Sequence, residues 1–495
     1  MRGARTSKRT AVTGRILAVP GALALALMLG GCFAAIGTPE RQVSLPDPPK
    51  ETTGSLPPAQ REHERIIVAY SGVYEDSRIE ALVKQAVDKL VAASERPDQR
   101  YRITILNSPA INAFALPSGQ LYVTRGLVAL ANDTSELASV LSHEMAHVIA
   151  QHATIREDRA RQVALVTRVF DNLNSDPEMT ALALAKSKIA LASFSRAQEF
   201  EADGIGVGIA ARAGYDPYGA VRFLTSMGRN ADLKATTQVQ IDPRAPDFLS
   251  SHPATPERVR NAQTNARQFT APGSGERDRA SYIAAVDGMV YGEDPSEGFA
   301  RGRRFLHPKL GFTFVAPQGF ALDNTAQAIL GVKEGGGQAL RLDVVRVPAE
   351  QSLSEYLTSG WIEGIDAKSV EELGINNFPA ATAMAKGDQW SFRIYAVRFG
   401  SDVYRFIYAT KRMTPETDKT FHDSVVSFRR MSLAETSSAK PLRLRVVTVG
   451  EGDTVERLAS RMAIHDRPVE RFRVINGLAP NDRLQPGDQV KIVTE

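Results

Sequence analysis

Cysteine is almost absent from this chain of 495 residues, because Cys32 is its only one. A single cysteine cannot form a disulfide within the chain, which excludes a disulfide-stabilised framework. Histidine is also scarce, with 8 residues, so a motif built from histidines carries information. The one long apolar run, residues 16–29, is short for a membrane span and is followed by glycines.

Neither sign of charge dominates. The chain has 60 basic and 56 acidic residues and a formal net charge of +4. Five of the basic residues and none of the acidic ones fall in residues 1–31, which leaves 55 basic against 56 acidic side chains in the remainder. This balance does not predict a basic surface, so nucleic acid is not an expected partner.

The first 31 residues combine a basic start, a short apolar run and small residues, a pattern that predicts a secretory signal peptide. The sequence LGGC that ends at Cys32 resembles the bacterial lipobox, which implies acylation of this cysteine and removal of the peptide before it. The alternative is an incidental buried thiol. Phe33 is not the aspartate of an inner-membrane retention signal, so we expect a periplasmic protein anchored by lipid, with the outer membrane favoured. Residues 32–62 are rich in proline and predict a tether.

The five residues from His143 to His147 form an HExxH motif inside a run with helical spacing. The two histidines are one helical turn apart, so both imidazoles can reach a single zinc ion. Glu144 lies at the edge of the same face, where a carboxylate can accept a proton from water without binding the metal. The alternative is a core helix that merely carries two histidines.

A catalytic zinc site needs a third protein ligand from another segment. Glu199 and Asp203 are four residues apart in a second predicted helix and therefore share a face. We expect Glu199 to bind zinc and Asp203 to accept the outer N–H of a zinc-binding histidine. Glu201 lies about 200° round the helix from Glu199 and is expected to point elsewhere. His152 lies about 180° round the first helix from the first motif histidine, which predicts a packed or capping histidine.

HExxH followed by ExxxD is the gluzincin arrangement. With the flanking segments 112–117 and 194–196, it makes residues 63–270 resemble the BepA-like and HtpX-like peptidases of family M48. The resemblance implies a mainly helical domain with a small β-sheet, endopeptidase activity and one zinc ion per chain. It implies the same roles as the spacing does, with ligands and catalyst at His143, His147, Glu199 and Glu144.

The resemblance also implies two features that spacing alone leaves open. The strand that holds Asn112, Ala113 and Phe114 would run along the cleft and pair with an extended substrate, although an ordinary edge strand fits the sequence equally well. His252 would lie near the metal as a fourth ligand that keeps the enzyme latent, the alternative being a surface histidine. Arg258 would accompany it as a cleft residue or a transition-state donor.

The remaining segments predict further domains. Residues 271–300 form a linker with a short helix, and residues 301–432 show alternating strands and two helices, which predicts a second α+β domain without a metal cluster of its own. After a linker at 433–442, residues 443–495 resemble a LysM module in their segments 449–454, 474–478 and 484–492. That resemblance implies a βααβ fold and binding of the N-acetylglucosamine backbone of peptidoglycan, the alternative being a degenerate module that contacts protein.

Taken together, these features predict a multi-domain α+β protein with two competing functions. The first is a zinc endopeptidase of the bacterial envelope that cuts extended, unfolded or misassembled envelope proteins, as in outer-membrane protein quality control. The second is a lipid-anchored, peptidoglycan-associated chaperone or adaptor whose zinc site is latent.

Overall fold

The computed structural model describes residues 57–156, 194–237, 248, 252–253, 255–325, 328–464 and 466–495. The signal peptide, Cys32 and most of the proline-rich tether predicted from the sequence lie outside the described residues. Within them, no helix has both the length and the apolar character that crossing a membrane requires.

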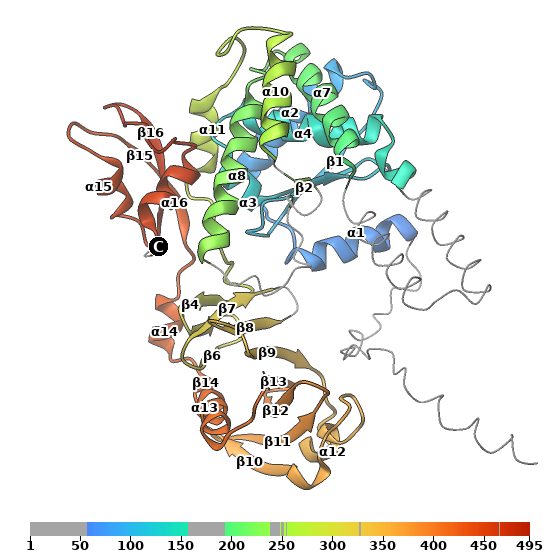
Figure 1. Cartoon of the computed structure of the whole chain (residues 1–495), viewed down its shortest axis with the longest axis vertical. Coiled ribbons are helices and arrows are strands. Elements are labelled where there is room, and N and C mark those ends of the chain that lie inside the picture. The colour runs from blue at the N-terminus through green and yellow to red at the C-terminus, as the bar shows by residue number, and fades with distance from the viewer. Residues whose placement is uncertain are drawn as a thin grey trace, which may run out of the picture. The chain divides into compact units, whose positions relative to one another are not determined.

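The first part of the described chain is mainly helical, with one small sheet (Figure 1). Its elements are α1 (Pro58–Ala69), α2 (Ser77–Ala93), β1 (Arg102–Leu106), β2 (Ala113–Ala115), β3 (Gln120–Thr124), α3 (Arg125–Leu130), α4 (Thr134–Ile149), α7 (Arg196–Arg212), α8 (Gly219–Thr237), α10 (Pro256–Arg267) and α11 (Arg279–Val286). Helix α1 begins inside the segment predicted as tether, because Pro58 occupies its first turn, where a missing N–H costs nothing.

Helix α4 is the centre of this part. Asp133 caps it by accepting a hydrogen bond from the Glu136 N–H, and every residue from Thr134 to His147 is buried. Helix α7 crosses it closely enough that a Cβ added to Gly206 would lie 3.0 Å from the His143 backbone nitrogen. The absence of a side chain at this position therefore lets the two helices approach closely.

The small sheet has the order β1-β3-β2, with β1 parallel and β2 antiparallel to β3. Strand β2 packs beside α4 and has β3 on one side only. Its other edge therefore carries no strand of the described residues.

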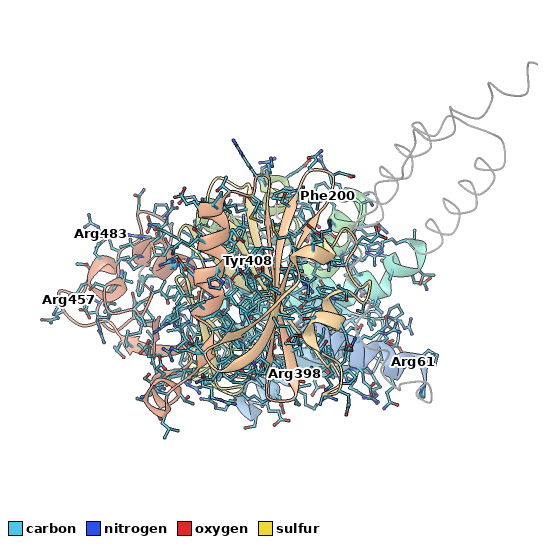
Figure 2. The ribbon with its side chains drawn as sticks, turned by 90° about the horizontal axis from the view of Figure 1, so that it is seen from below. Arg61, Phe200, Arg398, Tyr408, Arg457 and Arg483 are labelled. Atoms are coloured by element: carbon cyan, nitrogen blue, oxygen red, sulfur yellow. The ribbon has the colours of Figure 1, made fainter. Side chains whose placement is uncertain are left out.

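Residues 299–430 form two antiparallel sheets over a separate aromatic core. The seven-stranded sheet has the order β10-β11-β12-β13-β9-β8-β7 and the four-stranded sheet the order β14-β6-β5-β4. Their elements are β4 (Phe299–Arg301), β5 (Arg304–His307), β6 (Phe312–Val315), β7 (Phe320–Asn324), β8 (Ile329–Lys333), β9 (Gln338–Val345), α12 (Leu353–Leu357), a 3-10 helix (Ala367–Ser369), β10 (Glu371–Ile375), β11 (Phe378–Lys386), β12 (Ser391–Phe399), β13 (Asp402–Thr410), α13 (Pro415–Val426) and β14 (Arg429–Arg430). Tyr408 on β13 belongs to this core (Figure 2).

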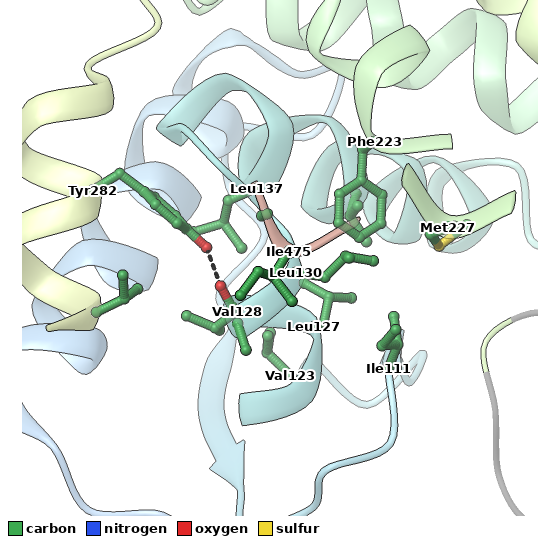
Figure 3. Close-up of a cluster of buried hydrophobic side chains, with 14 of the residues drawn as sticks. Ile111, Val123, Leu127, Val128, Leu130, Leu137, Phe223, Met227, Tyr282 and Ile475 are labelled. Atoms are coloured by element: carbon green, nitrogen blue, oxygen red, sulfur yellow. Dashed lines mark hydrogen bonds between the residues drawn. The ribbon is translucent and has the colours of Figure 1, made fainter. Parts of the chain in front are cut away.

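After α14 (Leu433–Ser438), the last segment has the predicted βααβ order: β15 (Arg443–Thr448), α15 (Val455–Ala459), α16 (Pro468–Ile475) and β16 (Gln489–Thr494). Its two strands pair antiparallel. Its apolar residues are not a separate core but join the core of the helical part. Figure 3 shows Ile475 of α16 among Leu130, Leu137 and Phe223.

A buried lysine fixes this contact. Lys491 of β16 has no exposed surface, and its Nζ donates to the carbonyls of Ala129 and Ala131, each at 2.8 Å, with the Leu130 carbonyl at 3.5 Å. These carbonyls end helix α3, where partial negative charge favours a cation. Burial lowers the pKa of Lys491, so the charged form depends on these acceptors.

We expect Lys491→Met to lower the free energy of unfolding of the full chain by about 1–3 kcal/mol, because buried carbonyls lose their donor. Chemical denaturation measures this value. Arg457→Met in the same module is the control, since the Arg457 side chain is 69% exposed (Figure 2). Equal stability of the two variants would contradict the role given to Lys491.

Candidate metal centre

Helix α4 carries the two histidines of the motif on one face. The Nε2 atoms of His143 and His147 are 3.0 Å apart, and both side chains are about 5% exposed. Their convergence follows from the one-turn spacing on a straight, buried helix.

Helix α7 brings in the two carboxylates. Ser195 starts it with a capping box in which its hydroxyl accepts from the Gln198 N–H. Glu199 lies in the first turn, with its carboxylate oxygens 3.6 Å from His143 Nε2 and 3.5 Å from His147 Nε2. Asp203, one turn later, lies 3.1 Å from Nδ1 of His143. The structure thus brings together the residues that the spacing predicts as ligands and supporter.

His252 completes the group. Its Nδ1 lies 2.9 Å from a Glu199 oxygen and 3.3 Å from His143 Nε2, and its Nε2 lies 3.7 Å from Glu144. It is 2% exposed, so the alternative interpretation as a surface histidine is wrong. Sequence spacing gives no sign of this position, because residue 252 follows no helical register with α4 or α7.

The four donors fit a zinc ion. Their ligand atoms all lie within 4.8 Å of one another. The donor pairs described above are 2.9–3.6 Å apart, close to the spacing of about 3.4 Å between ligands of a tetrahedral zinc. Among the residues that the structure describes, this is the only such group of metal-ligating side chains. Burial lowers the pKa of all three histidines, to about 3 for His252, so their nitrogen lone pairs are available to a metal at neutral pH.

Arg258 holds both carboxylates. It donates from Nε and Nη2 to the two oxygens of Asp203, at 2.9 and 2.7 Å, and its Nη1 lies 2.7 Å from Glu199. Burial alone would raise the pKa of Asp203, but the hydrogen bonds from Arg258 and His143 lower it to about 2. Arg258 is 3% exposed and faces these two partners, which is a supporting position and not that of a free transition-state donor.

Glu144 follows His143 on α4 and faces the same centre. Burial, followed by the negative charge of Glu199, raises its pKa well above the usual value, while a backbone hydrogen bond from Ala115 acts in the opposite direction. One of its oxygens is buried without a hydrogen-bond partner. A carboxylate kept in this condition is suited to exchanging protons with a bound molecule.

The segment predicted to bind substrate lies beside this centre. Ala113 and Phe114 belong to β2, and Phe114 stacks on Tyr122 with ring centres 4.8 Å apart. Asn112 is buried, and its side-chain amide donates to the Tyr70 hydroxyl at 2.7 Å. Asn112 therefore supports the strand, in which Ala113 is also buried and Phe114 and Ala115 are half-buried.

His152 is buried, as expected of a packed histidine, and Glu201 is not among the metal-ligating side chains, but the two contact each other and His152 contacts His147. The Nδ1 atoms of His152 and His147 lie 2.9 Å apart, and Nε2 of His152 lies 3.3 Å from Glu201. The helical projection fails because α4 ends at Ile149 and Gln151 adopts a left-handed φ of 54°, which turns the chain back. No sequence signal marks this turn, since left-handed residues are usually glycine or asparagine.

Comparisons with known proteins agree with this geometry. Residues 77–266 match the family described as Peptidase family M48, and residues 447–493 match the LysM domain. The chain is 30% identical over 190 residues to the Beta-barrel assembly-enhancing protease of Escherichia coli, which covers 37% of each chain. It is 29% identical over 204 residues to the mitochondrial metalloendopeptidase OMA1 of Arabidopsis thaliana, covering 40% of this chain and 38% of that one.

A third relative, the mitochondrial metalloendopeptidase OMA1 of Schizosaccharomyces pombe, is 30% identical over 84 residues, which cover 17% of this chain and 25% of that one. The chain thus spans less than two-fifths of the length of these curated relatives. The resemblance drawn from the motifs is confirmed for both segments. The four donors, Glu144 and their supporting residues all fall inside the first match, so residues 77–266 are a peptidase family M48 domain and residues 447–493 are a LysM domain.

Proposed function

We propose that the chain is a zinc-dependent endopeptidase of the bacterial envelope. The observation that carries the proposal is the meeting of His143, His147 and Glu199 at one buried point that Glu144 also faces. Three protein ligands and a carboxylate beside them are the minimum of a hydrolytic zinc site.

The roles follow from position. Zinc bound at this point would supply Lewis-acid chemistry, lowering the pKa of water and polarising the scissile carbonyl. Glu144 would accept the proton of the attacking water and pass it to the leaving amine. Asp203, 3.1 Å from Nδ1 of His143, would hold that ring with Nε2 directed at the metal, and Arg258 would hold Asp203.

In this arrangement His252 would act as a fourth ligand and close the site. Four protein donors leave no position for water on a tetrahedral ion, so the resting enzyme would be latent. The His252 N–H donates to the Phe248 carbonyl at 2.7 Å, and the Phe248 N–H donates to the Ile111 carbonyl at 3.0 Å. A peptide that pairs with the edge of β2 and extends to residue 111 would compete for the Ile111 carbonyl, which would loosen the support of His252.

Substrates of this enzyme would be extended segments of unfolded or misassembled envelope proteins. Pairing with the edge of β2 uses backbone groups, so it selects for exposed chain more than for sequence. The relative named Beta-barrel assembly-enhancing protease supports a role in outer-membrane protein quality control. Acylation at Cys32 would anchor the enzyme by lipid, with the outer membrane favoured, and the LysM domain would add contact with peptidoglycan.

A second candidate function is a lipid-anchored, peptidoglycan-associated chaperone or adaptor with a latent zinc site. The observation that favours it is His252, because its position gives the site four protein donors at rest. This function would need the LysM domain and the edge of β2 but not Glu144.

Metal-free chain should take up one zinc ion per chain. His147→Ala and Glu199→Ala should each weaken zinc affinity by more than about 100-fold, since loss of a ligand exceeds the 10–100-fold effect of losing a ligand's partner. Competition with a chromophoric chelator measures the affinity. His422→Ala, on α13, is the control and should bind as the parent chain does; an equal loss there would refute the assignment.

Glu144→Gln should bind zinc normally and cleave an unfolded casein at least about 100-fold more slowly, because the general base is gone. Gel analysis of cleavage at saturating zinc measures this rate. Glu80→Gln on the surface of α2 is the matched control. Retained cleavage by the Glu144 variant would exclude the proposed mechanism.

His252→Ala separates the two functions. If His252 closes the zinc site, its removal should increase casein cleavage several-fold while Glu144→Gln in the same background abolishes it. If neither the parent chain nor the zinc-bound His252→Ala variant cleaves casein, the chaperone or adaptor function is favoured.

A further inference from the structure

The two motif histidines have different partners on their outer nitrogens. Nδ1 of His143 faces a carboxylate, Asp203, at 3.1 Å. Nδ1 of His147 faces another imidazole, with Nδ1 of His152 at 2.9 Å. His152 is 1% exposed, and its own Nε2 lies 3.3 Å from the carboxylate of Glu201, whose side chain is 59% exposed.

The position of His152 is built by the local fold. After the left-handed residue Gln151, residues 152–156 form a helical turn that directs the His152 ring back onto the end of α4. Phe194 stacks on the His147 ring, with centres 4.1 Å apart and planes at 28°, and the Arg156 guanidinium lies 4.7 Å from the Phe194 ring. His147 is thus held on one face by an aromatic ring and at Nδ1 by His152.

The hydrogen positions in this chain of groups follow from the metal. When the Nε2 lone pair of His147 is given to zinc, its proton is on Nδ1 and must be donated. His152 can accept it only through an unprotonated Nδ1, which places the His152 proton on Nε2, beside Glu201. For His147, His152 and Glu201 there is therefore one set of hydrogen positions in which every donor faces an acceptor.

We propose that His152 and Glu201 are positioning residues for the zinc ligand His147, and that Glu201 selects the tautomer of His152 that accepts the Nδ1–H of His147. The inference rests on the proposed zinc site. It assigns to the second ligand a support equivalent to the one that Asp203 gives the first.

The imidazole has an advantage over a second buried carboxylate at this point. Glu199, Glu144 and Asp203 already place three acidic groups within the buried centre. Another buried carboxylate beside His147 would add a desolvated negative charge, which is costly. His152 places an imidazole between His147 and Glu201, and the Glu201 carboxylate is largely exposed to water.

His152→Phe tests the proposal in the full chain, because it keeps a ring of similar size and removes the acceptor. We expect zinc affinity to fall about 10–100-fold, the range for loss of a ligand's hydrogen-bond partner. His152→Asn places an amide oxygen near the original Nδ1 and should recover most of the affinity. Chelator competition gives the affinities, and the visible spectrum of the cobalt-loaded chain reports the ligand geometry.

Two substitutions of Glu201 test the tautomer. Glu201→Gln keeps an acceptor and should bind zinc within about threefold of the parent chain. Glu201→Lys places a donor beside His152 Nε2, which forces its proton onto Nδ1 against the proton of His147, and should weaken binding about 10-fold or more. Glu80→Lys, an exposed charge reversal on α2, controls for the change in net charge.

Thermal melting of the metal-free variants shows whether they fold. Folded His152→Phe or Glu201→Lys chains that bind zinc as tightly as the parent, with the same cobalt spectrum, would overturn the proposal, and the lysine variant decides it if the phenylalanine variant does not fold. A parent chain that binds zinc but never cleaves casein would overturn the proposed function alone. A parent chain that binds no zinc would overturn both.

Discussion

The close contact between α4 and α7 is the constraint on which the metal centre depends. At Gly206 the two backbones approach so closely that an added Cβ would lie only 3.0 Å from the backbone nitrogen of His143. This approach lets a carboxylate from α7 reach two imidazoles from α4, although each helix alone presents only part of a ligand set. A side chain at 206 would press on the backbone of His143, and the donor distances of 2.9–3.6 Å depend on the close approach of the two helices.

Burial of so many ionisable groups in one place requires compensation. Arg258 neutralises Glu199 and Asp203 together, and Asp203 in turn supports His143. Removing one partner would leave another charge buried without a counterpart, which costs more than the pair itself contributes. The stability of each ligand and supporting residue in the centre therefore depends on the charges of the others.

The parts of the metal centre that depend on helical periodicity can be predicted from the sequence. The spacing of His143 and His147, and of Glu199 and Asp203, predicts shared faces, and both pairs meet as expected. Helical periodicity does not give the contact of His152 with His147 or with Glu201, because the chain leaves its helix at the left-handed Gln151. In the sheet domain, β11 has the sequence FPAATAMAK, whose alanines and proline are depleted in strands, so its sequence does not mark it as a strand.

Lys491 of the LysM domain binds the carbonyls at the end of helix α3, and this contact affects how the domain is oriented. The carbonyls that Lys491 binds belong to residues 129 and 131 at the end of α3, a short distance before Asp133, the cap of α4, and the two domains share one apolar core. A module joined by a loose linker would let the peptidase domain rotate freely about its anchor. Here the module and the peptidase domain are joined by a shared core, so a wall polymer bound by the module would also restrict the orientation of the metal centre.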